Sequence, residues 1–150
     1  MICNKYMMKK ICFLILTVLL IQCKKEKKLD RCACPENSTC TMEFVTLMVK
    51  VKDRAGSPVI LDQYYTLYSS AQDTLYVHPH NEYIDSIYKA EGTYPILSDS
   101  HLGYTQKCGS EFEFVGLRDG HEPIRKSFNI GNNCCHVEWQ KKHDDIVVDE

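Results

Sequence analysis

The chain of 150 residues has a formal charge of −2 at pH 7, and its length suits one folded domain preceded by a targeting segment. The charge is uneven, because residues 32–150 contain 10 Lys and Arg but 18 Asp and Glu, a net charge near −8. Binding to nucleic acid requires basic side chains that neutralise phosphates. We therefore expect no nucleic-acid partner.

The first segment has the pattern of an export signal. Lys9 and Lys10 precede an apolar run from Ile11 to Ile21. This run is about half the length of the roughly 20 apolar residues that a helix needs to span a bilayer. A basic flank followed by a short apolar core is typical of a secretory signal peptide. We predict a signal peptide over residues 1–22, with an uncleaved N-terminal anchor as the alternative.

The end of the apolar run, Leu20-Ile21-Gln22-Cys23, resembles the lipobox of bacterial lipoproteins, although Gln22 stands where a small residue is usual. In that family the Cys at the position of Cys23 is lipidated on its sulfur and becomes the new N-terminus. The resemblance implies a protein anchored through lipid in the membrane of the cell envelope. The outer membrane is favoured, and the periplasmic and surface faces both stay open. Residues 23–31 then form a basic tether.

Six cysteines follow the tether, and an even number in an exported domain predicts disulfides, for which 15 connectivities exist. Their spacings contain no Cys-x2-Cys pair, so zinc is the weaker interpretation. The first three lie in a turn-rich Cys-rich segment, residues 32–42. The six candidates are Cys32, Cys34, Cys40, Cys108, Cys134 and Cys135.

Neighbouring residues of a strand point to opposite sides, so Cys134 and Cys135 are expected to have different partners. We predict that one of them bonds Cys108 and that the other ties the Cys-rich segment to the domain, with one further bridge inside that segment. Two alternatives are a bond between Cys134 and Cys135 and a free Cys135 thiol beside His136, which would lower the thiol pKa.

Short strands dominate the remaining chain. Residues 43–52 alternate, with Val45, Leu47, Val49 and Val51 on one face, which predicts a strand with one buried side. A hairpin is indicated around Asp119-Gly120. Ser98-Asp99-Ser100 is expected to end the strand at 94–97. Further strands are expected at 59–68, 73–78, 94–97, 111–117, 124–130, 134–140 and 146–148, and one short helix at 83–89, where Tyr83, Ile84, Ile87 and Tyr88 line one face. We predict that residues 43–150 form an all-β antiparallel sandwich of about seven strands.

Two groups of motifs resemble known sandwiches. Residues 49–53 followed by Gly56-x-Pro58-Val59 are similar to the opening of the carboxypeptidase-regulatory-like and transthyretin-like families. A second group of motifs resembles small uncharacterised bacterial lipoproteins. These motifs are residues 92–96 with Asp99, the Phe112-x-Phe114-x-Gly116 pattern with Asp119-Gly120, and residues 134–137. The resemblance implies a prealbumin-like sandwich and no activity. The C-terminal Tyr-Arg-Gly-Ser that marks the transthyretin-like hydrolases is absent, because residues 147–150 are Val-Val-Asp-Glu.

His78 and His80 form the metal-site hypothesis. In extended backbone two residues at this spacing point to the same side, and Glu82 and Asp85 lie close by in the sequence. Imidazole with carboxylate suits zinc or copper. The alternative is a solvated His-Pro-His turn.

Many tyrosines fall in the middle third of the chain. Exposed aromatic rings could stack on sugars, whereas tyrosine also fits the rim of a sandwich with its hydroxyl in water. The seven are Tyr64, Tyr65, Tyr68, Tyr76, Tyr83, Tyr88 and Tyr94.

Together these observations predict a lipid-anchored, non-enzymatic binding or accessory module of the cell envelope. It requires no cofactor, its partners are the membrane and a protein or carbohydrate ligand, and no catalytic constellation is recognisable. The alternative is a metal- or thiol-dependent factor or enzyme that uses His78 with His80, or Cys135 with His136.

Overall fold

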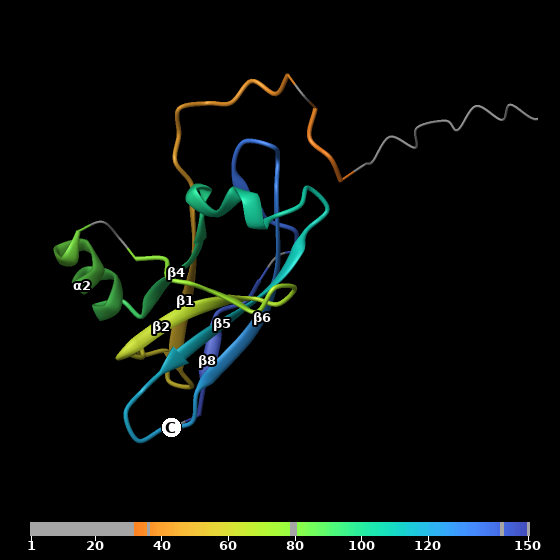
Figure 1. Ribbon diagram of the computed structural model, residues 1–150. Coiled ribbons are helices and arrows are strands. Elements are labelled where there is room, and N and C mark those ends of the chain that lie inside the picture. The colour runs from red at the N-terminus through yellow and green to blue at the C-terminus, as the bar shows by residue number, and fades with distance from the viewer. Residues whose placement is uncertain (1–31, 36, 79–80, 142, 150) are drawn as a thin grey trace, which may run out of the picture. The chain divides into compact units, whose positions relative to one another are not determined.

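The computed structural model describes residues 32–35, 37–78, 81–141 and 143–149 (Figure 1). The predicted signal peptide of residues 1–22, the lipidation site Cys23, the tether of residues 23–31 and His80 lie outside these residues. Within the described part, no helix combines the length and apolar character needed to cross a bilayer.

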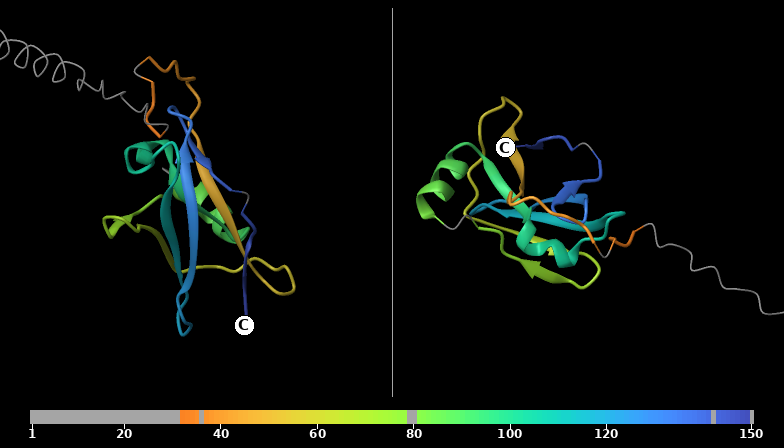
Figure 2. Two further views of the ribbon diagram at one scale, coloured as in Figure 1. Left: turned by 90° about the vertical axis from the view of Figure 1, so that its right-hand side faces the viewer. Right: turned by 90° about the horizontal axis from the view of Figure 1, so that it is seen from above.

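The domain is all-β and sandwich-like, as predicted, and its strands form two sheets (Figures 1 and 2). The first sheet has the order β4-β1-β8, formed by Thr93–Ser98, Thr46–Asp53 and Ile146–Val148. The second has the order β3-β2-β5-β6-β7, formed by Asp73–Leu75, Gln63–Tyr68, Ser110–Leu117, Ile124–Asn132 and Val137–Trp139.

The described residues form eight strands, in agreement with the prediction of about seven. One detail of the predicted sandwich is wrong. The last strand, β8, runs parallel to β1, with Val51 opposite Ile146, so the sandwich is not wholly antiparallel. β8 follows β7, which belongs to the other sheet, so β8 joins β1 without the hairpin that would have made the pair antiparallel.

Strand β1 follows the predicted alternation. Leu47, Val49 and Val51 are buried, while Thr46 and Lys50 on the opposite side are exposed. One face of the strand therefore belongs to the core, and the other faces outward. The strands around the predicted hairpin are also confirmed: β5 and β6 pair antiparallel from Ser110–Ile130 to Gly116–Ile124.

The core contains side chains from both sheets, which is why the two sheets stay together. Tyr94 is fully buried, and its hydroxyl donates to the carbonyl of Val59 and accepts from the amide of Leu61, both at 2.8 Å. These bonds hold the segment before β2 against β4. The other fully enclosed large side chains are Phe112, Phe114, Leu61, Ile96, Leu97 and Ile130.

The predicted helix is confirmed as α2 (Glu82–Ala90). It begins where the side chain of Asn81 accepts a hydrogen bond of 2.8 Å from the amide of Tyr83, a common N-terminal cap. The predicted apolar face is only partly correct, because Tyr83 is 70% exposed. No residue of this nine-residue helix is fully buried, since α2 lies at the rim of the sandwich and not within it.

A second short helix was not expected. The residues predicted to end the preceding strand begin a 3-10 helix, η1 (Asp99–Tyr104). It starts directly after Ser98, which closes β4. This position places Asp99 beside Val45, the residue directly before β1.

Candidate functional site

Three disulfides join the Cys-rich segment to the C-terminal half of the domain. All six predicted cysteines are paired, with Cα–Cα distances of 5.0 to 5.4 Å, which suit disulfide geometry. The pairs are Cys32–Cys108, Cys34–Cys134 and Cys40–Cys135, with sequence separations of 76, 100 and 95 residues.

The predicted connectivity is wrong in part. Cys108 bonds Cys32 rather than Cys134 or Cys135, and the three cysteines of the segment form no bridge with one another. The segment runs along the end of the domain instead of folding on itself (Figure 1, orange), so each of its cysteines reaches a different partner. Cys134 and Cys135 do have separate partners, as expected. Because Cys135 is bridged, the alternative with a free thiol beside His136 does not hold.

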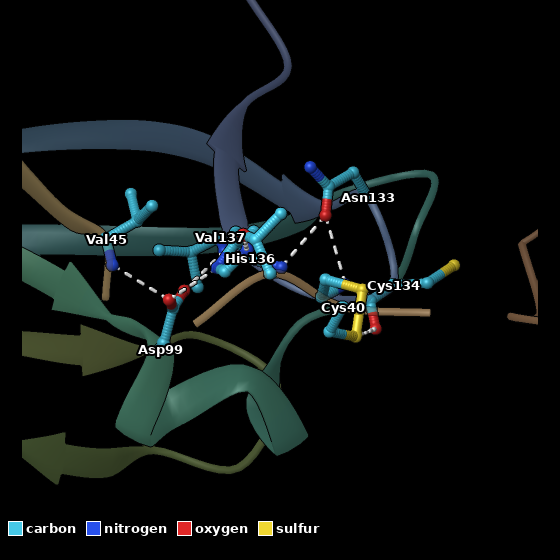
Figure 3. A network of polar contacts seen from close by, with 9 residues as sticks. Cys40, Val45, Asp99, Asn133, Cys134, His136 and Val137 are labelled. Atoms are coloured by element: carbon cyan, nitrogen blue, oxygen red, sulfur yellow. Dashed lines mark hydrogen bonds and ion pairs between the residues drawn. A yellow bond between two sulfur atoms is a disulfide. The ribbon is translucent and has the colours of Figure 1, made fainter. Parts of the chain in front are cut away.

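Asp99 connects three segments at this end of the domain (Figure 3). Its carboxylate accepts hydrogen bonds of 2.8 Å from the backbone amides of Val45 and Val137 and contacts Nδ1 of His136 at 2.7 Å. The side chains of Asp99 and His136 are 11% and 14% exposed. The carboxylate thus fixes the entry to β1 and the start of β7 from one enclosed position.

The hydrogen bonds keep Asp99 ionised. Burial by itself would raise the pKa of this carboxyl, but the bonds from His136, Val45 and Val137 outweigh burial and hold the pKa below its ordinary value. A carboxylate without a proton can only accept, so Nδ1 of His136 must donate to it.

The other nitrogen of His136, Nε2, lies 2.8 Å from the hydroxyl oxygen of Thr41. Thr41 directly follows Cys40, and His136 directly follows Cys135, so the bridge between these cysteines brings the two side chains together. Neither Thr41 nor Asp99 was expected from the sequence to belong to a site. The sequence pairs Cys40-Thr41 and Cys135-His136 would have indicated that Thr41 and His136 meet. That signal could be used only if the correct one of the 15 connectivities was already known.

A second candidate region is a groove of about 480 Å³ between α2, η1 and the outward face of β1 and β4. Its apolar lining includes Phe44, Met48, Ile84, Tyr88 and Pro95. Phe44 is 61% exposed, although it belongs to the side of the first strand that was expected to face solvent. The presence of Phe44 and Met48 on that side was a sequence signal for a binding surface, and no site was predicted from it.

Hydrogen-bonding groups lie among the apolar side chains of the groove. Ser98 and His101 contact each other at 3.1 Å through Oγ and Nδ1. Burial lowers the pKa of His101, and the hydrogen bond between its imidazole and the backbone of Ser98 only partly opposes this effect. The imidazole is therefore neutral at pH 7 and offers hydrogen bonds rather than charge.

The imidazole of His78 belongs to a chain of polar contacts with Tyr64, Asp85 and Lys89. Its Nδ1 lies 3.2 Å from the hydroxyl of Tyr64, which donates to Asp85 at 2.9 Å, and Asp85 pairs with Lys89 at 2.8 Å. Burial and the bond to Asp85 raise the pKa of Tyr64. Among the described residues no group of three metal-ligating side chains converges, and His80, the other predicted ligand, lies outside them.

The seven tyrosines differ in burial, and Tyr65, Tyr68 and Tyr88 are partly buried. Tyr64 and Tyr94 belong to the core, whereas Tyr76 and Tyr83 are 66% and 70% exposed. Tyr76 also borders a smaller hollow of about 200 Å³ together with Tyr65 and Lys89. The predicted aromatic surface is therefore limited to a few rings near α2.

Comparisons of the chain with models of protein families, with curated proteins and with solved structures find no significant match. Its function is therefore inferred from the two regions above: the Asp99 network and the groove.

Proposed function

We propose that this protein is a lipid-anchored binding or accessory module of the cell envelope and that the groove beside α2 is its ligand site. Anchoring through Cys23, with the outer membrane favoured, rests on the resemblance of residues 20–23 to a lipobox. A prealbumin-like relationship rests on the motifs of residues 49–59 and 92–137, and the arrangement of strands in two sheets is compatible with it. The groove is the observation that carries the proposed function.

The lining of the groove favours a protein ligand over a carbohydrate. Phe, Tyr and Met are enriched at the centres of protein interfaces, and Phe44, Met48 and Tyr88 occur together here. A volume of about 480 Å³ can enclose a few large apolar side chains. Ser98 and His101 add hydrogen-bonding groups that can select the orientation of a peptide.

The net charge of the domain also favours a protein ligand and indicates that this ligand is basic. The domain from residue 32 onward has a net charge near −8, which attracts basic partners and increases their rate of association. We therefore propose as ligand a peptide segment that presents one or two large apolar side chains flanked by Lys or Arg.

A random peptide library displayed on phage tests this function directly, with the full chain in detergent as bait. Clones retained by the wild type should be enriched in large apolar residues near basic ones. Met48→Asp places a charge in the groove and should abolish their binding. Val147→Asp is the matched control, because Val147 is an apolar residue that is 53% exposed on β8, outside the residues that line the groove.

Clones that bind the wild type and Val147→Asp but not Met48→Asp would support the proposal. Clones that bind all three proteins equally would locate binding elsewhere on the surface. If the library yields no clones with the wild type, while sugars cause chemical-shift changes at Tyr65 and Tyr76, a carbohydrate ligand would replace the peptide.

A further inference from the structure

Thr41, His136 and Asp99 form a continuous chain of hydrogen bonds. The distance from Thr41 Oγ1 to His136 Nε2 is 2.8 Å, and the distance from His136 Nδ1 to Asp99 Oδ2 is 2.7 Å. A hydroxyl within hydrogen-bond reach of an imidazole, with the imidazole oriented by a carboxylate, is the arrangement that activates a nucleophile. Such a constellation is recognised by its geometry and by the roles of its members, not by their order in the chain.

The direction of each bond follows from the partners of Asp99. Its two oxygens accept from the amides of Val45 and Val137 and have no proton to give, so His136 donates from Nδ1. In the neutral imidazole, Nε2 then carries a lone pair, and the hydroxyl of Thr41 must donate to it. His136 is thus held in the tautomer that can accept a proton from Thr41.

The surroundings hold these groups in position before any substrate arrives. The bridge Cys40–Cys135 fixes the residues immediately before Thr41 and His136. The side chain of Asn133 accepts a hydrogen bond of 2.8 Å from the amide of His136, and Figure 3 shows Asn133 beside His136 and Cys134. His136 is enclosed, with 14% of its side chain exposed, whereas Thr41 is exposed. A donor molecule can therefore reach the hydroxyl while the base stays fixed.

We propose that Thr41 is an acyl-accepting nucleophile, with His136 as its general base and Asp99 as a positioning residue, which makes the protein a hydrolase of activated esters or thioesters. This activity is separate from the proposed peptide binding and does not depend on it. The acyl donor comes from solution, and the second reactant is water.

The reaction balances in two steps. Thr41 Oγ1 bonds to the acyl carbon, the bond from that carbon to the leaving oxygen or sulfur breaks, and the hydroxyl proton passes through His136 Nε2 to the leaving group. Water then gives a proton to Nε2, its oxygen bonds to the acyl carbon, and the bond to Oγ1 breaks as the proton returns to Thr41.

Incubation of the full chain in detergent with p-nitrophenyl acetate tests the proposal. We expect release of p-nitrophenolate and one acetyl group on the peptide that contains Thr41, mapped by mass spectrometry. Thr41→Val should remove that acetyl group and slow the release roughly 100-fold. Thr41→Ser should retain both signals, since it keeps the hydroxyl.

Thr39→Val is the matched control, because Thr39 is another exposed threonine of the same segment, and this change should leave both signals intact. Val147→Asp should also leave them intact, and Thr41→Val should leave peptide binding unchanged, so the failure of either proposal can be told from the failure of the other. Release that is equal in the folded wild type and in Thr41→Val would overturn the proposal, whether or not an acetyl group is found on Thr41. The three groups would then serve only to hold the Cys-rich segment.

Discussion

The backbone amide of Val51 in β1 donates a hydrogen bond of 2.8 Å to the carbonyl of Gly92, the residue directly before β4. The carbonyl oxygen of Val51 lies 2.5 Å from the point where a Cβ on Gly92 would stand. Gly92 also has a positive φ of 63°, and its amide donates to Lys89 at the end of the helix. One glycine thus ends α2 and joins it to β1, which positions one wall of the groove.

Replacement of this glycine should destabilise the domain. Gly92→Ala adds a methyl group against a backbone oxygen and forces a non-glycine residue into the left-handed region, so we expect a loss of about 2 kcal/mol or more in the free energy of unfolding. Urea denaturation followed by the fluorescence of Trp139, the single tryptophan, measures it. Gly103→Ala is the control, because in the described part of the chain nothing beyond the adjoining backbone lies within 4 Å of the point where its Cβ would stand. Equal losses in both variants would contradict the role of Gly92.

The Asp99 network should make stability depend on acid. The pKa of Asp99 in the folded domain is below its ordinary value, which is near 3.9 in an unfolded chain. The ionised group therefore contributes stability that is complete above about pH 4 and is lost as the pH falls through the folded pKa.

We expect Asp99→Asn to cost about 1–3 kcal/mol at pH 7, and the difference from the wild type should shrink below about pH 4. Urea titrations at several pH values test both expectations. Asp73→Asn changes an exposed carboxylate and should stay within about 0.5 kcal/mol of the wild type at pH 7. A deficit of Asp99→Asn that stays constant as the pH falls well below about 4 would argue against the ionised carboxylate as its cause.

The stability that one disulfide contributes should depend on whether the other two are present. A bridge with a separation of 95 residues contributes about 4–5 kcal/mol in the chain-entropy model when it acts alone. Cys34–Cys134 already joins the same two segments, so Cys40–Cys135 closes only a short additional loop, for which the model gives about 2–3 kcal/mol.

The double variant Cys40→Ala, Cys135→Ala should therefore remain folded with a loss of about 2–3 kcal/mol, and full reduction should cost much more. Thermal unfolding of the variant and of the reduced protein gives the comparison. A peptide map of non-reduced protein should recover Cys32 linked to Cys108. A recovered Cys108–Cys134 or Cys108–Cys135 peptide would refute the connectivity.

The proposed lipidation at Cys23 predicts a specific mature form. Intact mass of membrane-extracted protein should show the loss of residues 1–22 and the gain of acyl groups at Cys23. Cys23→Ala should leave an unprocessed, unacylated precursor. Cys12→Ala changes a cysteine of the apolar run and should be processed normally, and a wild-type protein that retains Met1 without modification would contradict the prediction.

The sequence by itself determined the elements that depend on neighbouring residues. The alternation around Val49 produced β1, the turn at Asp119-Gly120 produced the β5–β6 hairpin, and the helical spacing of Ile84, Ile87 and Tyr88 produced α2. These signals are local, because hydrophobic periodicity, turn conformations and helix caps act over a few residues. The even number of cysteines likewise predicted that all six are bridged.

Only the tertiary structure decided which distant groups meet. The pairing of Cys40 with Cys135, the parallel alignment of β8 with β1 and the 2.7 Å contact between Asp99 and His136 join residues 37 to 95 positions apart. Six cysteines are chemically identical in the sequence, so no local pattern selects one of 15 pairings. Their partners, and with them the meeting of Thr41 and His136, are chosen when the two sheets pack around one core and bring Cys40 beside Cys135.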